Sequence, residues 1–159
     1  MAVSGRDREF LQRAIELANH SVDAGGGPFG AVVVRDGEIV GRGHNRVTLD
    51  LDPTAHAEVL AIRDACRSLG DFSLQGGVLY ASCEPCPMCM AAIYWARIDR
   101  VVFAASGEDA ARAGFDDRLI AREICRPYGE RSLPVERCDC EGHDSAFRRW
   151  MALADKTLY

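Results

Sequence analysis

A strand, a helix and a second strand follow one another in the middle of the chain, and this pattern restricts the fold more than any other feature. Two apolar runs, 77–81 and 100–104, flank the stretch 86–96, which has a helical composition. A helix between two neighbouring strands forms a crossover, which makes the strands parallel. Parallel strands are typical of folds in which helices cover a sheet. We therefore predict an α/β fold.

The first third of the chain supplies a helix and two strands. Apolar residues recur at helical spacing over 6–24, and the run Gly25–Gly27 ends this predicted helix. Segments 31–35 and 38–43 flank the pair Asp36-Gly37, which is typical of two-residue hairpin turns. We therefore expect an antiparallel hairpin after the helix.

The rest of the chain adds helices and one more strand. Helices are predicted over 53–69, with Thr54 as the cap, and over 117–124 and 145–154. A fifth strand is predicted near 133–137. The elements follow one another without a repeat or a linker, so we expect a single domain of all 159 residues. The predicted architecture is a three-layer α/β/α sandwich with a mixed five-stranded sheet.

Composition and charge narrow the kind of partner. Of the residues 48% are hydrophobic, which suits one compact domain. The net charge of −5 disfavours nucleic acids as partners, so a small neutral substrate fits better. The chain has no apolar run long enough to span a membrane, and its charged first segment is unlike a signal peptide. We therefore expect a cytoplasmic protein.

Two short segments contain the residue types of a hydrolytic metal site. His56-Ala57-Glu58 stands near the start of one predicted helix, and Pro85 to Cys89 (PCPMC) stands at the start of another. Clustered cysteines in a reducing compartment are metal ligands or redox groups more often than disulfides. A catalytic zinc takes three protein ligands and leaves its fourth position to water. We predict that His56, Cys86 and Cys89 bind zinc.

Glu58 is predicted to move protons rather than to bind the metal. It stands two residues after His56, so on a regular helix its side chain points about 200° away. A carboxylate beside a zinc site can accept a proton from water and pass it to a nitrogen of the substrate. We expect general acid and base catalysis from Glu58.

Cys83 leaves two other interpretations open. It could join His56, Cys86 and Cys89 in a closed tetrahedral site, and the protein would then be a zinc-stabilised binding domain without turnover. Alternatively, the C-x-x-C pair could be a redox pair. Neither interpretation gives Glu58 a role. If the protein is an enzyme, Cys83 stays off the metal, on the turn that leads into the helix.

The two metal segments together form the pattern H-x-E and P-C-x-x-C of zinc-dependent nucleobase deaminases. Outside this pattern, the chain resembles the bacterial guanine deaminases of the cytidine deaminase superfamily over nearly its whole length. The segments that carry the resemblance are GPFGAV (27–32), DPTAHAEV (52–59), AIR (61–63), SCEPCPMCM (82–90), AIYWAR (92–97), AGFDD (113–117) and a C-terminal helix followed by Tyr159.

The resemblance implies an activity and an assembly. The expected reaction is zinc-dependent hydrolysis of guanine to xanthine and ammonia. Other substrates of the superfamily stay open, namely cytosine, guanosine, triazines such as ammeline, and adenosine in tRNA. In the resembled family the C-terminal segment, here about 140–159, is exchanged between subunits. A domain-swapped homodimer is therefore expected, in which Tyr159 completes the pocket of the partner.

The resemblance also implies roles for residues around the metal. Asp117, in the matched G-F-D-D, is implied as a second proton carrier or a substrate anchor. Phe29, Asn45 and Ala57 are implied as substrate-binding residues, with stacking by Phe29 and hydrogen bonding by Asn45.

Cys138, Cys140 and His143 have no counterpart in the resembled family. A soft metal could bind such a group, but no fourth ligand is spaced to close the site. We interpret the three residues as part of a loop.

Overall fold

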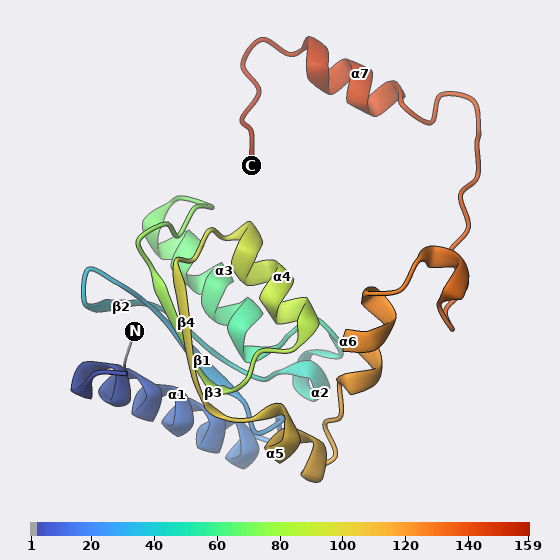
Figure 1. The fold of residues 1–159 in the computed structure, drawn as a ribbon. Helices are drawn as coiled ribbons and strands as arrows, with labels where there is room; N and C mark the ends of the chain where they lie inside the picture. Colours follow the sequence, from blue (N-terminus) through green and yellow to red (C-terminus); the bar gives the residue numbers. More distant parts are fainter. Residues whose placement is uncertain (1–2) are drawn as a thin grey trace. The chain divides into compact units, whose positions relative to one another are not determined.

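The computed structural model describes residues 3–159, and the first two residues of the predicted domain lie outside the described residues. The chain divides into two compact units, one that ends at Leu119 and one over Ile120–Tyr159 (Figure 1). Among the described residues, no helix is both long and apolar enough to cross a membrane.

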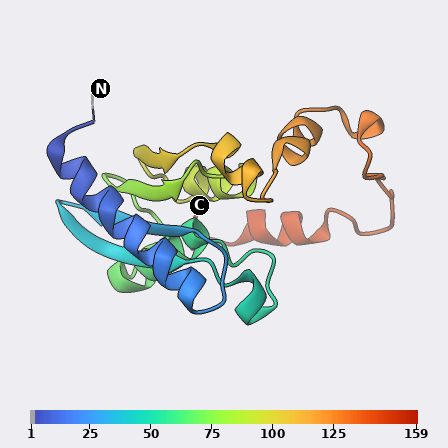
Figure 2. The ribbon, with the colours of Figure 1, turned by 90° about the horizontal axis from the view of Figure 1, so that it is seen from below.

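The first unit contains a mixed sheet between layers of helices. Strand β1 pairs antiparallel with β2 and with β3, whereas β3 and β4 pair parallel, as the crossover predicted. Helix α1 covers one face, and α3 and α4 cover the other (Figures 1 and 2). The strands, in the spatial order β2-β1-β3-β4, and the helices are β1 (Gly30–Arg35), β2 (Glu38–His44), β3 (Val78–Cys83), β4 (Arg100–Ala105), α1 (Gly5–Asp23), α3 (Ala57–Leu69) and α4 (Pro87–Trp95).

The prediction of five strands is wrong, because the sheet of the described chain has four. The segment 133–137 forms no strand and belongs to the second unit. Pro134 lacks the backbone N–H that a ladder needs, and the charged residues after it do not alternate with apolar ones. Leu133 and Val135 are accordingly exposed.

The hairpin between β1 and β2 has the predicted turn. Asp36 and Gly37 have φ values of 52° and 79°, as the left-handed positions of a type I′ turn require. The register shifts between Val33 and Val34, because Val33 pairs with Gly41 and Val34 with Ile39. This irregularity adds one residue to β2.

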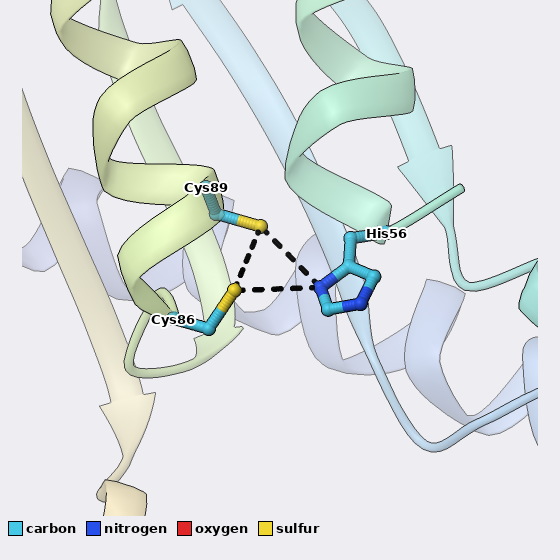
Figure 3. Close-up of side chains that lie close together, drawn as sticks. All are labelled: His56, Cys86 and Cys89. Carbon is cyan, nitrogen blue, oxygen red and sulfur yellow. Dashed lines mark hydrogen bonds between the residues drawn. The ribbon is translucent and has the colours of Figure 1, made fainter. Parts of the chain in front are cut away.

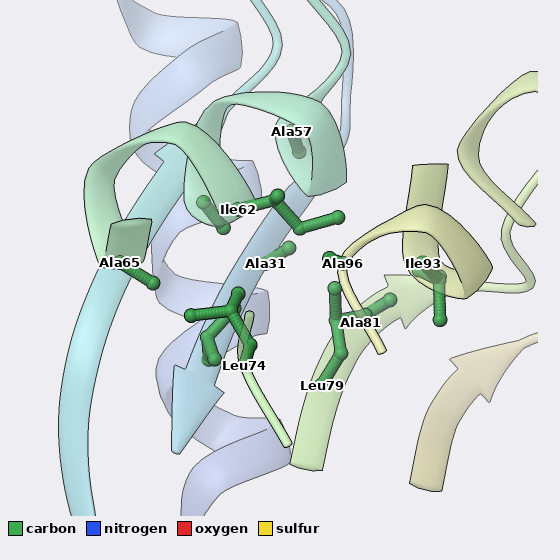
Figure 4. Packing of buried hydrophobic residues seen from close by; sticks show 11 residues of the cluster. Ala31, Ala57, Ile62, Ala65, Leu74, Leu79, Ala81, Ile93 and Ala96 are labelled. Atoms are coloured by element: carbon green, nitrogen blue, oxygen red, sulfur yellow. The ribbon is translucent and has the colours of Figure 1, made fainter. Parts of the chain in front are cut away.

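Strand β1 is buried on both faces. Ala31 and Val33 belong to a cluster with α3 and α4, which Figure 4 shows from close by. Val32 and Val34 belong to a second cluster, against which Phe10 of α1 packs. Alternate side chains of one strand therefore bind both helical layers to the sheet.

The N-terminus of α1 is fastened to the sheet by a buried carboxylate. Ser4 and Asp7 form a capping box, in which each side chain bonds the other residue's backbone N–H. Asp7 also accepts hydrogen bonds from the hydroxyl of Tyr80 (2.7 Å) and from the guanidinium of Arg100 (3.0 and 3.1 Å). The bonds from Ser4, Tyr80 and Arg100 hold the pKa of Asp7 well below its usual value.

Shorter elements complete the chain. The helices predicted over 117–124 and 145–154 are confirmed, with slightly shorter bounds. Elements that the sequence did not predict are α2, α5 and η1. The bounds are α2 (Val47–Asp50), α5 (Gly107–Arg112), α6 (Arg118–Ile124), η1 (Tyr128–Glu130) and α7 (Ser145–Ala152).

Candidate metal centre

The two metal segments form the N-termini of α3 and α4. His56 is the N-cap of α3, so the cap lies two residues after Thr54, the predicted cap. The side chain of Thr54 instead donates to the carboxylate of Asp52 over 2.7 Å. Cys86 is the N-cap of α4, and Pro87 occupies the first helical position, which suits its fixed φ. Neither N-cap side chain makes a capping hydrogen bond, which leaves both available to a ligand.

His56, Cys86 and Cys89 meet in a triangle (Figure 3). The Nδ1 atom of His56 lies 3.6 Å from Sγ of Cys86 and 3.5 Å from Sγ of Cys89, and the two sulfur atoms are 3.5 Å apart. Tetrahedral zinc with its usual bond lengths separates nitrogen and sulfur ligands by about 3.5 Å, and two sulfur ligands by about 3.8 Å. The three residues therefore fit zinc without rearrangement.

Cys83 lies apart from this triangle. It is the last residue of β3, is 7% exposed, and its thiol donates to the carbonyl of Ser106 over 3.5 Å. Burial raises the pKa of this thiol. The described residues therefore offer zinc three ligands, not a closed set of four that includes Cys83.

Glu58 lies beside the triangle and outside it. Its side chain is 6% exposed, and Oε2 is 3.4 Å from Sγ of Cys89, a thiol donor. Burial raises the pKa of the Glu58 carboxyl. Because His56 has the extended backbone of an N-cap, the angular separation expected for a regular helix does not apply to this pair.

The pKa values of the two metal-site cysteines shift in opposite directions. The hydrogen bond with Cys89 and the interaction with His56 lower the pKa of Cys86 to about 4. The same bond with Cys86, together with burial, raises the pKa of Cys89. The hydrogen bond to Cys86 raises the pKa of His56. Of the two thiols, Cys86 is therefore the more readily deprotonated.

Phe29 and Asn45 lie next to each other at the start of β1 and the end of β2. The backbone N–H of Asn45 donates to the carbonyl of Phe29 over 2.9 Å. The following residue, Arg46, donates its backbone N–H to Ala55, which precedes His56 (3.0 Å). These bonds join the predicted substrate-binding residues to the segment that carries the first metal ligand.

Phe115 is a neighbour of Phe29, and the sequence alone predicted no role for it. Its ring meets that of Phe29 edge to face, with ring centroids 5.0 Å apart. The sequence did contain a signal for Phe115, because this residue belongs to the same G-F-D-D segment as Asp117. Asp117 follows two residues later and is half-buried, outside the group of three ligands.

The other predicted site residues differ in burial. Ala57 is the first residue of α3 and is fully buried. Tyr159 belongs to the second unit and is exposed. Cys138, Cys140 and His143 are exposed and form no candidate metal group in the part of the chain that the structure describes.

Comparison with known proteins identifies a family whose zinc-binding region matches this chain. Residues 4–105 match the cytidine and deoxycytidylate deaminase zinc-binding region. The chain belongs to this family. The match contains all three residues of the triangle and Glu58, so the family's zinc-binding region coincides with the geometric site.

Two curated relatives in this family span most of the chain. The chain is 54% identical to the guanine deaminase of Bacillus subtilis over 151 residues, which are 94% of this chain and 97% of the relative. It is 37% identical to the tRNA-specific adenosine deaminase of the same organism over 144 residues, which are 91% of this chain and 89% of that protein.

Solved structures of family members agree with this fold. The X-ray structure of guanine deaminase from Bacillus subtilis superposes with a TM-score of 0.92 at 53% identity, over 96% of this chain and 98% of that one. Guanine deaminase from Nitrosomonas europaea gives a TM-score of 0.67 at 31% identity, over 74% and 67% of the two chains.

Proposed function

We propose that this protein is a zinc-dependent guanine deaminase, which hydrolyses guanine to xanthine and ammonia. The observation that carries the proposal is the nearly full-length identity of 54% with a guanine deaminase. The ligand triangle and the buried carboxyl beside it supply the chemical groups that the hydrolysis needs.

Glu58 carries the protons in the proposed reaction. Zinc held by His56, Cys86 and Cys89 would supply Lewis-acid activation of water. Glu58 accepts one proton of the attacking water and delivers it to N3 of guanine, while the oxygen bonds to C2. Glu58 then transfers the remaining hydroxyl proton to the amino group, so that the C2–N bond breaks. Ammonia leaves, and C2 becomes a carbonyl carbon of xanthine.

The neighbouring residues bind the base in this proposal. Phe29, backed by the edge contact with Phe115, stacks on the purine. Asn45 hydrogen-bonds the base. Ala57 offers the backbone N–H of the first residue of α3, which has no acceptor within the helix. Asp117 anchors the substrate or serves as a second proton carrier.

A domain-swapped homodimer is part of the proposal, with the segment of about 140–159 exchanged and Tyr159 completing the partner's pocket. The second unit supports it, because Phe147, Met151 and Leu158 are large apolar side chains that are exposed in the single chain. Apolar surface of this kind marks an interface between chains. A second copy of the same chain would cover it.

A cytoplasmic location and a part in purine breakdown complete the proposal. None of the seven cysteines forms a disulfide in the described structure, which fits a reducing compartment. Xanthine and ammonia are the products expected when guanine is degraded rather than reused.

Ammonia release by the zinc-loaded protein tests the activity. Guanine, guanosine, cytosine, adenine, ammeline and a tRNA with adenosine at the wobble position are compared at equal concentration. We expect guanine to have the highest kcat/KM. Faster release from any other compound would overturn the guanine assignment, and no release from any of them would favour a binding domain.

A further inference from the structure

Ser21 links the last turn of α1 to Asn45. Its side chain is completely buried, and its hydroxyl donates to the backbone carbonyl of Asn45 over 2.8 Å. The carbonyl of Ser21 accepts the backbone N–H of Gly26 over 2.7 Å. One residue of α1 therefore holds both the end of β2 and the glycine turn that precedes Phe29.

The amide of Asn45 has one possible orientation in this setting. Its Oδ1 accepts the backbone N–H of Gly27 (3.3 Å) and of Val47 (3.2 Å). Both partners are donors, so the oxygen and not the nitrogen must face them. The Nδ2 donors remain for a ligand, and Asn45 is only 6% exposed.

The glycine turn packs directly against this arrangement. A Cβ atom on Gly26 would overlap the carbonyl oxygen of Asn45 and the hydroxyl of Ser21. A Cβ atom on Gly27 would lie 3.1 Å from Cγ and Oδ1 of Asn45. Gly25 has a φ of 86°, which glycine adopts without strain. The turn therefore closes over the Ser21–Asn45 hydrogen bond and keeps water from competing for it.

We propose that Ser21 is a positioning residue for substrate binding, which acts by holding the Asn45 amide donors at a fixed place for an acceptor atom of the purine. The inference rests on the proposed function, because it takes Asn45 to bind the base. Ser21 touches no reacting atom, so its loss should weaken substrate binding and leave the proton transfers of Glu58 unaffected.

The first test compares Ser21→Ala with Ser21→Cys, which keeps the size but donates weakly. Both should raise the KM for guanine about 3- to 10-fold, as expected for one neutral hydrogen bond, with kcat changed less than twofold. Ser4→Ala is the matched control, because it removes the N-cap of the same helix far along α1 from Asn45. It should lower the melting temperature and leave KM unchanged.

A double-mutant cycle separates positioning from general stability. If Ser21 acts through the Asn45 side chain, Ser21→Ala should raise KM no further in a protein that already carries Asn45→Ala. Additive effects on KM would overturn the proposal. So would an unchanged KM in both Ser21 variants, or a failure of both to fold, which would make Ser21 a residue of stability alone.

A measurement without substrate distinguishes this inference from the proposed function. The side-chain amide signals of Asn45 in the NMR spectrum should shift in Ser21→Ala and stay in place in Ser4→Ala. If the wild-type protein does not deaminate guanine, the proposed function fails. The NMR measurement still shows whether Ser21 positions the side chain of Asn45. Unmoved Asn45 signals in Ser21→Ala would contradict the positioning, whatever the substrate.

Discussion

The cysteines Cys83, Cys86 and Cys89 stand close together in the sequence and have three different environments. Cys83 donates to a backbone carbonyl at the end of a strand. Cys86 is the half-buried N-cap of α4, and its pKa is lowered to about 4. Cys89 is fully buried beside Glu58. Residue type alone therefore does not distinguish the three cysteines, whereas the grouping of Cys86 and Cys89 with His56 does.

Replacing single cysteines tests this assignment. Cys83→Ser should keep one zinc per chain, because its sulfur bonds a carbonyl rather than the metal. Cys89→Ser should lose the zinc, because only two ligands of the triangle remain. Metal analysis after gel filtration gives the stoichiometry. Loss of zinc from Cys83→Ser would restore the closed-site interpretation.

Replacing Glu58 by Gln separates metal binding from catalysis. Zinc should stay bound, since Glu58 lies outside the ligand triangle. The value of kcat should fall by about 10²- to 10⁴-fold, the usual contribution of general acid and base catalysis. The exposed Glu108 of α5 gives a control, and Glu108→Gln should keep both zinc and activity. Normal turnover by Glu58→Gln would refute the proposed role.

At the scale of elements, the success of the sequence predictions depended on how local their causes are. The turn at Asp36 and Gly37 is set by adjacent residues, and it was predicted correctly. The segment 133–137 looked apolar enough locally for a strand, but Pro134 lacks a backbone N–H, and no strand of the described residues pairs with it. The cap of α3 was misplaced because the segment before His56 is held by a tertiary contact, in which Ala55 accepts the backbone N–H of Arg46.

The metal ligands were predictable because the spacing of the histidine and the cysteines is typical of a zinc site. The contacts that hold the predicted substrate-binding residues in place were not predictable. Ser21 and Asn45 are 24 residues apart, and neither position shows a pattern that would join them. Phe115 meets Phe29 only through the folded loop. Contacts of this kind depend on tertiary packing, which a single sequence does not display.

The fastening of α1 to the sheet predicts a pH dependence of stability. The folded pKa of Asp7 lies below its ordinary value of 3.8, so its stabilisation is present above that pH and is lost as the pH falls further. Asp7→Asn should therefore lower the urea midpoint at pH 7, and the difference from wild type should shrink below about pH 4. Asp23→Asn, an exposed position on the same helix, should leave the midpoint nearly unchanged. An equal difference at both pH values would contradict the assignment.

At the scale of the whole molecule, the proposed exchange of C-terminal segments predicts that two inactive variants restore each other. Glu58→Gln keeps the tail, and a chain without Leu158 and Tyr159 keeps Glu58. In a mixed swapped dimer, one pocket receives both an intact carboxyl and an intact tail. Mixing under conditions that exchange subunits should therefore recover about half the activity in each mixed dimer. Activity that stays at the level of the separate variants would contradict the exchange.

The ligand triangle also has a mechanical consequence. His56 and Cys86 are 30 residues apart, and the chain between them contains α3 and β3. Zinc bound at the triangle would thus be a reversible cross-link, and by the chain-entropy model, closing a loop of this length is worth about 3–4 kcal/mol. Chelation should lower the melting temperature as well as stop turnover, which calorimetry with and without a chelator measures. Zinc supply would then control how much folded protein persists, in addition to how fast each molecule works.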